Sequence, residues 1–193
     1  GKVINIASRC AGFINKQFDG LLSDRIADED LWQQFIEAEK TIADFYEVDD
    51  TSKAVREITR LADLANQYIA QHEPWKLNKD PERREDLQLI CSQAINMFRS
   101  LAIYLKPILP EMAKKSEAFL NVSELMWSDH STPLLGHNIG AFKSMLTRME
   151  MKTVDQLVAA SAQTSSSDAK ADSEAPAAAE VENDSHITID DFT

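Results

Sequence analysis

Glycine, proline and cysteine are all scarce in this 193-residue sequence, and each shortage excludes a class of structure. Five glycines and six prolines, with few runs of β-branched residues, favour helices over sheets. Cys10 and Cys91 stand far apart without a C-x-x-C pair, which argues against a disulfide framework or a structural zinc site and fits a reducing cytoplasm. No apolar run is long enough to span a membrane, and no signal-peptide pattern begins the chain.

Residue patterns that carry catalysis are also missing. The four histidines are scattered without metal-ligand spacing, and no pair of acids is arranged for acid–base chemistry. Neither of the two common glycine-rich nucleotide-binding motifs occurs. We therefore expect no catalytic residue, metal or cofactor in this sequence.

The acidic excess is concentrated at one end of the chain. The formal net charge is −12, and residues 161–193 carry −7 of it through eight acids and one lysine. This segment is mainly Ala, Ser, Asp and Glu without an apolar period, so it cannot bury enough surface to offset its chain entropy. We expect a disordered acidic linker over residues 161–193. Basic residues elsewhere can then attract phosphate despite the acidic total.

Apolar residues recur at helical spacing in five segments, which predicts an all-α bundle. The expected helices cover residues 3–20, the run that follows the acidic turn at 28–30, the run from Thr51 or Ser52 to Pro74, the run from Asp80 to Pro107, and residues 110–120. Thr51 or Ser52 is expected to cap the third helix, and Gly20 to end the first. Residues 121–150 are less regular, and residues 151–161 could form a last short helix.

Three side chains from two separated segments have the chemistry to read one unpaired nucleobase. Asn5 and Arg9, in NIASR, are four residues apart and share one helix face. Trp75, in EPWK, follows Pro74 at the mouth of a loop, where an indole is hard to bury completely. A ring stacks on a base, an amide offers a donor and an acceptor, and a guanidinium offers donors only. A cytosine edge has two acceptors, O2 and N3, and one amino donor, N4. Arg9 would serve the acceptors, and Asn5 would serve the mixed remainder.

Each of these residues also has a purely structural interpretation. Trp75 could cap the edge of the bundle, the role that we expect for Trp32 and Trp127. Asn5 and Arg9 could belong to a solvated helix face, although asparagine is a mediocre helix former. Acids are interleaved with the basic residues after Trp75, so those residues fit a solvated turn as well as contact with a nucleic-acid backbone. The candidates for backbone contact are Lys2, Lys16, Lys76, Lys79, Arg83 and Arg84.

Three separated blocks resemble, in order, parts of the anticodon-binding domain of bacterial methionyl-tRNA synthetases: GKVINIASRCAGFINKQFDG, KAVREITRLADLANQYIAQHEPWKL and CSQAINMFRSLAIYLKPILP. The resemblance extends from Lys2 to about Leu157. It implies an antiparallel helix bundle of the class I synthetase type. It also implies that Asn5, Arg9 and Trp75 contact the anticodon, chiefly its first base, with Pro74 fixing the loop. The partner would be methionine tRNA with its CAU anticodon.

The resemblance also implies a division of the chain. Residues 1–120 would form the anticodon-binding bundle. Residues 121–160 would be an irregular segment and short helix that pack on a catalytic domain, and residues 161–193 a linker to a C-terminal tRNA-binding domain. The closing ITIDDFT resembles the lead-in to that domain.

Several expectations concern the parent enzyme. The chain starts without methionine and lacks the family's ATP-site signatures (His-Ile-Gly-His and Lys-Met-Ser-Lys-Ser) and zinc-binding insertion, so we expect a non-catalytic piece of a longer ligase. ATP, magnesium and a structural zinc would belong to the parent's catalytic domain. We expect the piece to be a cytoplasmic monomer and the full-length parent a homodimer, because the family's dimer contact lies in the C-terminal domain.

Two alternatives remain open at this stage. Synthetases for isoleucine, valine, leucine and cysteine use related bundles, so the cognate tRNA could differ. A helical protein-interaction scaffold with Trp75 as its anchor would belong to another class altogether. Binding to an anticodon stem-loop separates these possibilities.

Overall fold

The computed structural model describes residues 1–143, which form six α-helices and two short 3₁₀ helices. The elements are α1 (Lys2–Gln17), α2 (Glu29–Glu47), α3 (Thr51–His72), α4 (Pro74–Leu77), η1 (Pro81–Arg83), α5 (Arg84–Leu105), α6 (Pro110–Leu120) and η2 (Trp127–Ser131). The extended pairing in this part of the chain amounts to one isolated antiparallel bridge, between Leu21 and Asn138. The all-α prediction is confirmed.

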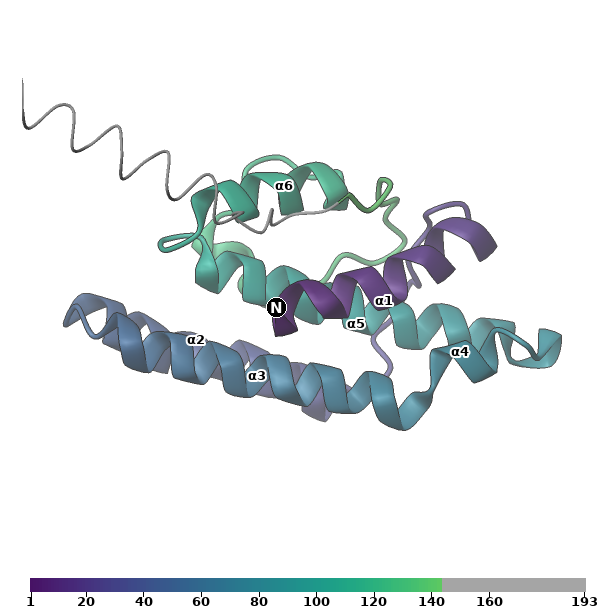
Figure 1. The fold of residues 1–193 in the computed structure, drawn as a ribbon, viewed down its shortest axis with the longest axis horizontal. Helices are drawn as coiled ribbons and strands as arrows, with labels where there is room; N and C mark the ends of the chain where they lie inside the picture. Colours follow the sequence, from purple (N-terminus) through teal and green to yellow (C-terminus); the bar gives the residue numbers. More distant parts are fainter. Residues whose placement is uncertain (144–193) are drawn as a thin grey trace, which may run out of the picture. The chain divides into compact units, whose positions relative to one another are not determined.

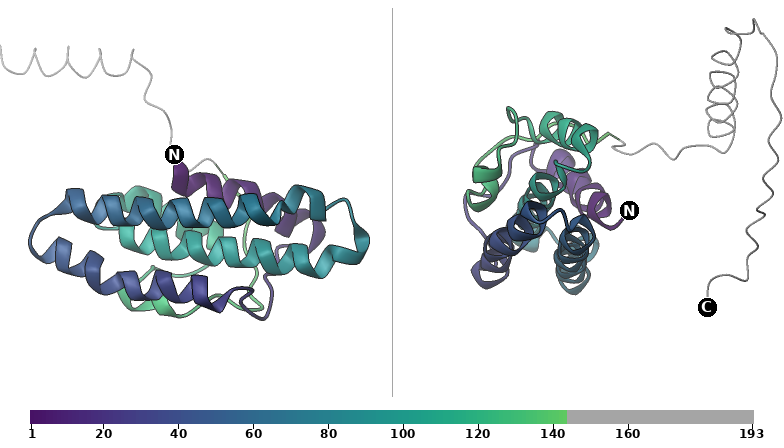
Figure 2. Two further views of the ribbon diagram at one scale, coloured as in Figure 1. Left: turned by 90° about the horizontal axis from the view of Figure 1, so that it is seen from below. Right: turned by 90° about the vertical axis from the view of Figure 1, so that its left-hand side faces the viewer.

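Helix α5 is the centre of the bundle, and every residue from Ile90 to Leu105 is buried. Helices α1, α2, α3 and α6 all pack against it (Figure 1). Figure 2 shows that α2 and α5 run in one direction and α1 and α3 in the opposite one. Helices α1 and α3 are therefore parallel neighbours, and both are antiparallel to α5.

The first helix is shorter than its apolar pattern suggests. The expected helix over residues 3–20 ends at Gln17, and Asp19 and Gly20 adopt positive φ angles of 52° and 84°. A Cβ on residue 20 would lie 2.7 Å from the carbonyl oxygen of Ile139, so the backbone at Ile139 packs directly against this turn. Glycine is needed here for the tight turn and the close approach.

Two other helix starts also differ from expectation. The N-cap of α3 is Asp50, whose Oδ1 accepts from the backbone N–H of Lys53 at 3.1 Å, so the prediction of Thr51 or Ser52 was wrong by one or two positions. Asp50 also forms an ion pair with the Lys53 ammonium at 2.7 Å, an interaction that a hydroxyl cannot make. The helix expected from Asp80 begins as the 3₁₀ turn η1 and becomes α-helical at Arg84.

Residues 121–143 pack on the bundle's own central helix. Arg99 of α5 donates to the backbone carbonyls of Asp129 and Thr132, at 2.8 and 2.6 Å. Asn96 donates to the Leu134 carbonyl at 3.1 Å and accepts from the Leu134 N–H at 2.6 Å. Burial lowers the pKa of the Arg99 guanidinium. The packing of the bundle thus continues past residue 120, and contact with a catalytic domain stays a prediction.

Some expectations fall on residues 144–193, outside the described residues. They are the short helix at 151–161, the disordered linker at 161–193 and its lead-in ITIDDFT. Within residues 1–143, no helix combines the length and apolar character that crossing a bilayer requires. The same part of the chain has no cluster of His, Cys, Asp and Glu side chains able to hold a metal ion.

Candidate nucleic-acid interface

Helices α1 and α3 meet in a regular register. The Lys2 ammonium lies 2.7 Å from a carboxylate oxygen of Asp63, and Asn5 Nδ2 lies 3.4 Å from Asn66 Oδ1. Both pairs are 61 positions apart in sequence. A constant offset is expected for two parallel helices, since each advances about 1.5 Å per residue. We call the line along which these pairs meet the α1–α3 seam.

The register also places Arg9 beside the seam. Continuing the same offset brings Arg9 level with Ala70, one turn beyond the Asn5–Asn66 pair. Arg9 and Ala70 are both exposed, and a methyl side chain leaves the guanidinium uncovered. The seam runs towards the C-terminal end of α3, where α4 carries Trp75 (Figure 1). Asn5 and Arg9 thus lie along the seam on α1, and Trp75 lies on α4, which directly follows the end of α3.

The two helix residues keep hydrogen-bonding groups available for a ligand. Within residues 1–143, the Arg9 side chain takes part in no hydrogen bond or ion pair, so all of its guanidinium donors are free. Asn5 is half-buried and donates to Asn66, while its Oδ1 accepts no hydrogen bond from the described residues. On the opposite face, Ala7, Ala11 and Ile14 are buried, as the apolar stripe predicts.

Trp75 lies in the one-turn helix α4 rather than in an open loop. Helix α3 ends where Glu73 adopts a left-handed conformation (φ 45°), and the buried Pro74 begins the next turn. Proline is well suited to this first position because its φ is already helical. The Trp75 side chain remains 42% exposed. Trp32 is buried and Trp127 is half-buried with its indole N–H bonded to Glu39, so these two tryptophans take the packing roles expected of them.

Four of the six cations proposed for backbone contact already have partners inside the protein. Lys2 pairs with Asp63, and Lys76 pairs with Glu73 at 2.7 Å. Arg83 pairs with Asp86, and Arg84 donates to the Gln17 carbonyl while its guanidinium carbon lies 5.1 Å from the centre of the Phe18 ring. This pairing favours the solvated-turn interpretation for the residues that follow Trp75.

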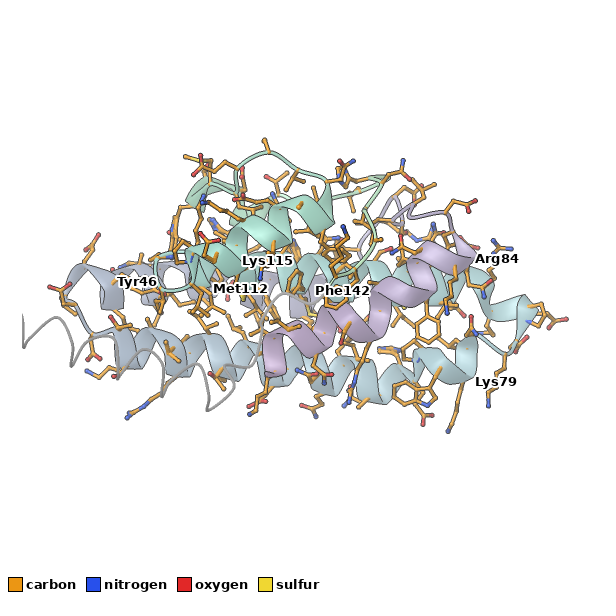
Figure 3. The ribbon with its side chains drawn as sticks, turned by 45° about the horizontal axis from the view of Figure 1, so that its top comes forward. Tyr46, Lys79, Arg84, Met112, Lys115 and Phe142 are labelled. Atoms are coloured by element: carbon orange, nitrogen blue, oxygen red, sulfur yellow. The ribbon has the colours of Figure 1, made fainter. Side chains whose placement is uncertain are left out.

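Lys16 and Lys79 are the remaining two candidates, and both are exposed. Neither ammonium group forms an ion pair or a side-chain hydrogen bond within the described part of the chain. Figure 3 shows Lys79 projecting from the turn between α4 and α5. Among the candidate residues within 1–143, the unpaired positive charge is therefore carried by Arg9, Lys16 and Lys79.

Sequence reasoning missed Asn66, which contacts Asn5 directly. The argument that asparagine is a mediocre helix former applies to Asn66 as well, because it lies within α3. Its Nδ2 donates to the carbonyls of Ala62 and Lys2, at 2.7 and 3.2 Å. The helix propensity was a usable signal, but the partner 61 positions away was not visible from local sequence.

Comparisons with known proteins identify the family. Residues 23–158 match the family model described as the anticodon binding domain of methionyl tRNA ligase. The match includes Trp75 and starts after α1, so Asn5 and Arg9 lie outside it. Because it covers more than half of the chain, it shows the family, and it confirms the resemblance found in the sequence.

Solved structures agree on the fold. The apo form of Mycobacterium tuberculosis methionyl-tRNA synthetase has a TM-score of 0.68 and 17% identity, covering 78% of this chain and 32% of that one. The same enzyme in complex with methionyl-adenylate has a TM-score of 0.69 and 17% identity, covering 77% and 31%. The chain thus spans about a third of the length of these structures. It belongs to the family of anticodon-binding domains of methionyl-tRNA ligases.

Proposed function

We propose that this domain recognises the CAU anticodon of methionine tRNA, as part of a methionine–tRNA ligase. The observation that carries the proposal is that Asn5 and Arg9 keep free hydrogen-bonding groups beside the α1–α3 seam, while the element that follows α3 carries an exposed tryptophan. Family membership supports the tRNA as the partner.

The available groups are complementary to cytosine, the first base of that anticodon. The Trp75 ring would stack on the base, a contact typically worth about 1–3 kcal/mol. Arg9 would donate to O2 and N3, and the unbonded Oδ1 of Asn5 would accept from the N4 amino group. Uracil has an N–H at N3 and a carbonyl at C4. It would therefore place a donor against the Arg9 donors and an acceptor against Asn5 Oδ1.

The charge distribution supports base readout more than strong backbone attraction. Residues 1–160 carry a formal charge of −5, given the −7 in residues 161–193. Few unpaired cations are available near Trp75, and each phosphate contact contributes to the salt dependence of binding. We therefore expect binding that depends modestly on salt and strongly on the identity of the first base.

The parent enzyme's remaining properties are part of the same proposal. Activation of methionine with ATP, with its magnesium and structural zinc, would take place on a catalytic domain outside this sequence. The full-length parent would act as a cytoplasmic homodimer. Residues 121–160 would contribute to the contact with the catalytic domain.

Titration with anticodon stem-loops tests the proposal. The loops share one stem and differ only in the anticodon, which is CAU, UAU or GAU, and fluorescence anisotropy gives each affinity. We expect CAU to bind at least about tenfold more tightly than UAU, because unpaired polar groups cost roughly 1–3 kcal/mol. Equal affinities would contradict base readout. Preference for GAU would indicate a sibling synthetase, and no binding to any loop would indicate an interaction scaffold.

A further inference from the structure

Asn66 has an orientation that its neighbours fix. Its amide nitrogen lies 2.7 Å from the Ala62 carbonyl oxygen and 3.2 Å from the Lys2 carbonyl oxygen. Carbonyl oxygens only accept hydrogen bonds, so the NH₂ group must face them. The Oδ1 atom of Asn66 is therefore the end that faces Asn5.

This orientation determines which end of Asn5 remains free. Only the NH₂ group of Asn5 can approach Asn66 Oδ1 favourably, and Nδ2 is the atom found there, at 3.4 Å. A reversed Asn5 amide would place two oxygens against each other. The Oδ1 atom of Asn5 is consequently turned away from Asn66, and it has no hydrogen-bond donor among the described residues.

We infer that Asn66 is a positioning residue that makes Asn5 select an amino group over a carbonyl on the anticodon's first base. This inference rests on the proposed function, in which Asn5 faces that base. With its amide held, Asn5 presents an acceptor and favours cytosine N4. Without Asn66, the Asn5 amide can rotate by about 180°, an amide flip, and donate from its NH₂ to the O4 carbonyl of uracil.

Asn66 could instead serve only to fasten α3 to α1, because it also bonds the Lys2 carbonyl. The two roles predict different results. A fastening role affects thermal stability and lowers the affinity for every loop alike. A positioning role affects the ratio of CAU affinity to UAU affinity, and it acts only while Asn5 is present.

A double-mutant cycle separates these roles. CAU and UAU affinities are measured for wild type, Asn66→Ala, Asn5→Ala and the double variant, each with a thermal melt. We expect Asn66→Ala to lower the CAU/UAU affinity ratio by roughly threefold to tenfold, the range of one net hydrogen bond. In the Asn5→Ala background, Asn66→Ala should change the ratio by less than about twofold. The exposed neighbour Gln67 supplies the control, because Gln67→Ala should leave the ratio unchanged.

The outcomes distinguish this inference from the proposed function. If Asn5→Ala lowers the ratio and Asn66→Ala does not, the positioning role is overturned and the proposed function stands. An equal effect of Asn66→Ala with and without Asn5 likewise overturns positioning through Asn5. If Asn5→Ala leaves the ratio unchanged, base readout by Asn5 fails and the inference fails with it.

A measurement without RNA tests the contact itself. In the free protein, NMR signals of the Asn5 side-chain NH₂ should exchange with water faster in Asn66→Ala than in wild type. Gln67→Ala should leave this exchange unchanged. Identical Asn5 signals and exchange in wild type and Asn66→Ala would overturn the inference whatever the RNA titrations show.

Discussion

The Lys2 ammonium lies 2.7 Å from a carboxylate oxygen of Asp63 across the α1–α3 seam. One of the lysines predicted from the sequence to contact the tRNA backbone is therefore already paired within the protein. Lys16, on the same helix, has no such partner in residues 1–143. The two lysines therefore form a matched pair for testing which cations contact RNA. A lysine paired with a carboxylate must lose that partner before it can neutralise a phosphate.

Lys16→Ala should lower the affinity for every stem-loop by the same factor. It should also reduce the slope of log K against log salt concentration by roughly 0.7–0.9, the contribution of one phosphate contact. Lys2→Ala should have the smaller effect on both quantities. Stem-loop titrations at several salt concentrations measure the two slopes. A larger loss for Lys2→Ala than for Lys16→Ala would show that the Lys2–Asp63 pair opens for RNA.

Arg9→Ala should reduce discrimination between CAU and UAU loops more than it reduces affinity for the UAU loop. The guanidinium donates to cytosine acceptors, and a hydrogen bond with a charged partner is worth roughly tenfold or more in affinity. Lys16→Ala is the control, since it removes a positive charge from the same helix without a proposed base contact. Equal losses of affinity for the CAU and UAU loops would indicate that Arg9 contacts the RNA backbone rather than a base.

Deletion of residues 161–193 should strengthen RNA binding slightly at low salt. The deleted segment carries −7 and repels phosphate, and salt at about 1 M shortens the range of this repulsion to about 3 Å. The difference should therefore vanish at high salt. The thermal midpoint should not change, because the segment has few apolar residues with which to pack. A large drop in that midpoint would contradict the expected disorder.

Gly20→Ala should destabilise the bundle more than Gly136→Ala does. Both glycines have positive φ, and that conformation costs other residues about 1–2 kcal/mol. A Cβ at position 136 would meet nothing within 4 Å, whereas one at position 20 would lie 2.7 Å from a backbone oxygen. Urea unfolding gives the two free-energy losses. Equal losses would mean that residues near Ile139 move aside without penalty.

The five longer helices were predictable because each is a long apolar period bounded by local start and stop signals. The burial of polar residues on α5 was not. Asn96 and Arg99 are buried, and backbone groups of Leu134, Asp129 and Thr132 bond the Asn96 amide and the Arg99 Nη1, although Arg99 Nε has no hydrogen-bond partner among the described residues. Those partners lie 30 or more positions away and belong to a segment without periodicity. Local sequence carries no signal for such contacts.

Part of the candidate site could likewise be predicted from local sequence, and part could not. The shared face of Asn5 and Arg9 follows from helical spacing, and the exposure of Trp75 follows from its place beside Pro74. The pairing of Arg83 with Asp86 is local and was foreseeable from the interleaved acids. The contacts of Lys2 with Asp63 and of Asn5 with Asn66 depend on the register of two helices 61 positions apart, which no local pattern specifies.

The affinity of the Trp75→Ala variant for the CAU stem-loop, measured beside its thermal melt, tests the central claim most directly. The account predicts a loss of about 1–3 kcal/mol in binding free energy, the value of one stacked base, with Trp75→Phe recovering part of it. It also predicts an unchanged melt, because the side chain is 42% exposed. Unchanged affinity would contradict anticodon recognition through Trp75, and a collapsed melt would show that this tryptophan serves packing instead.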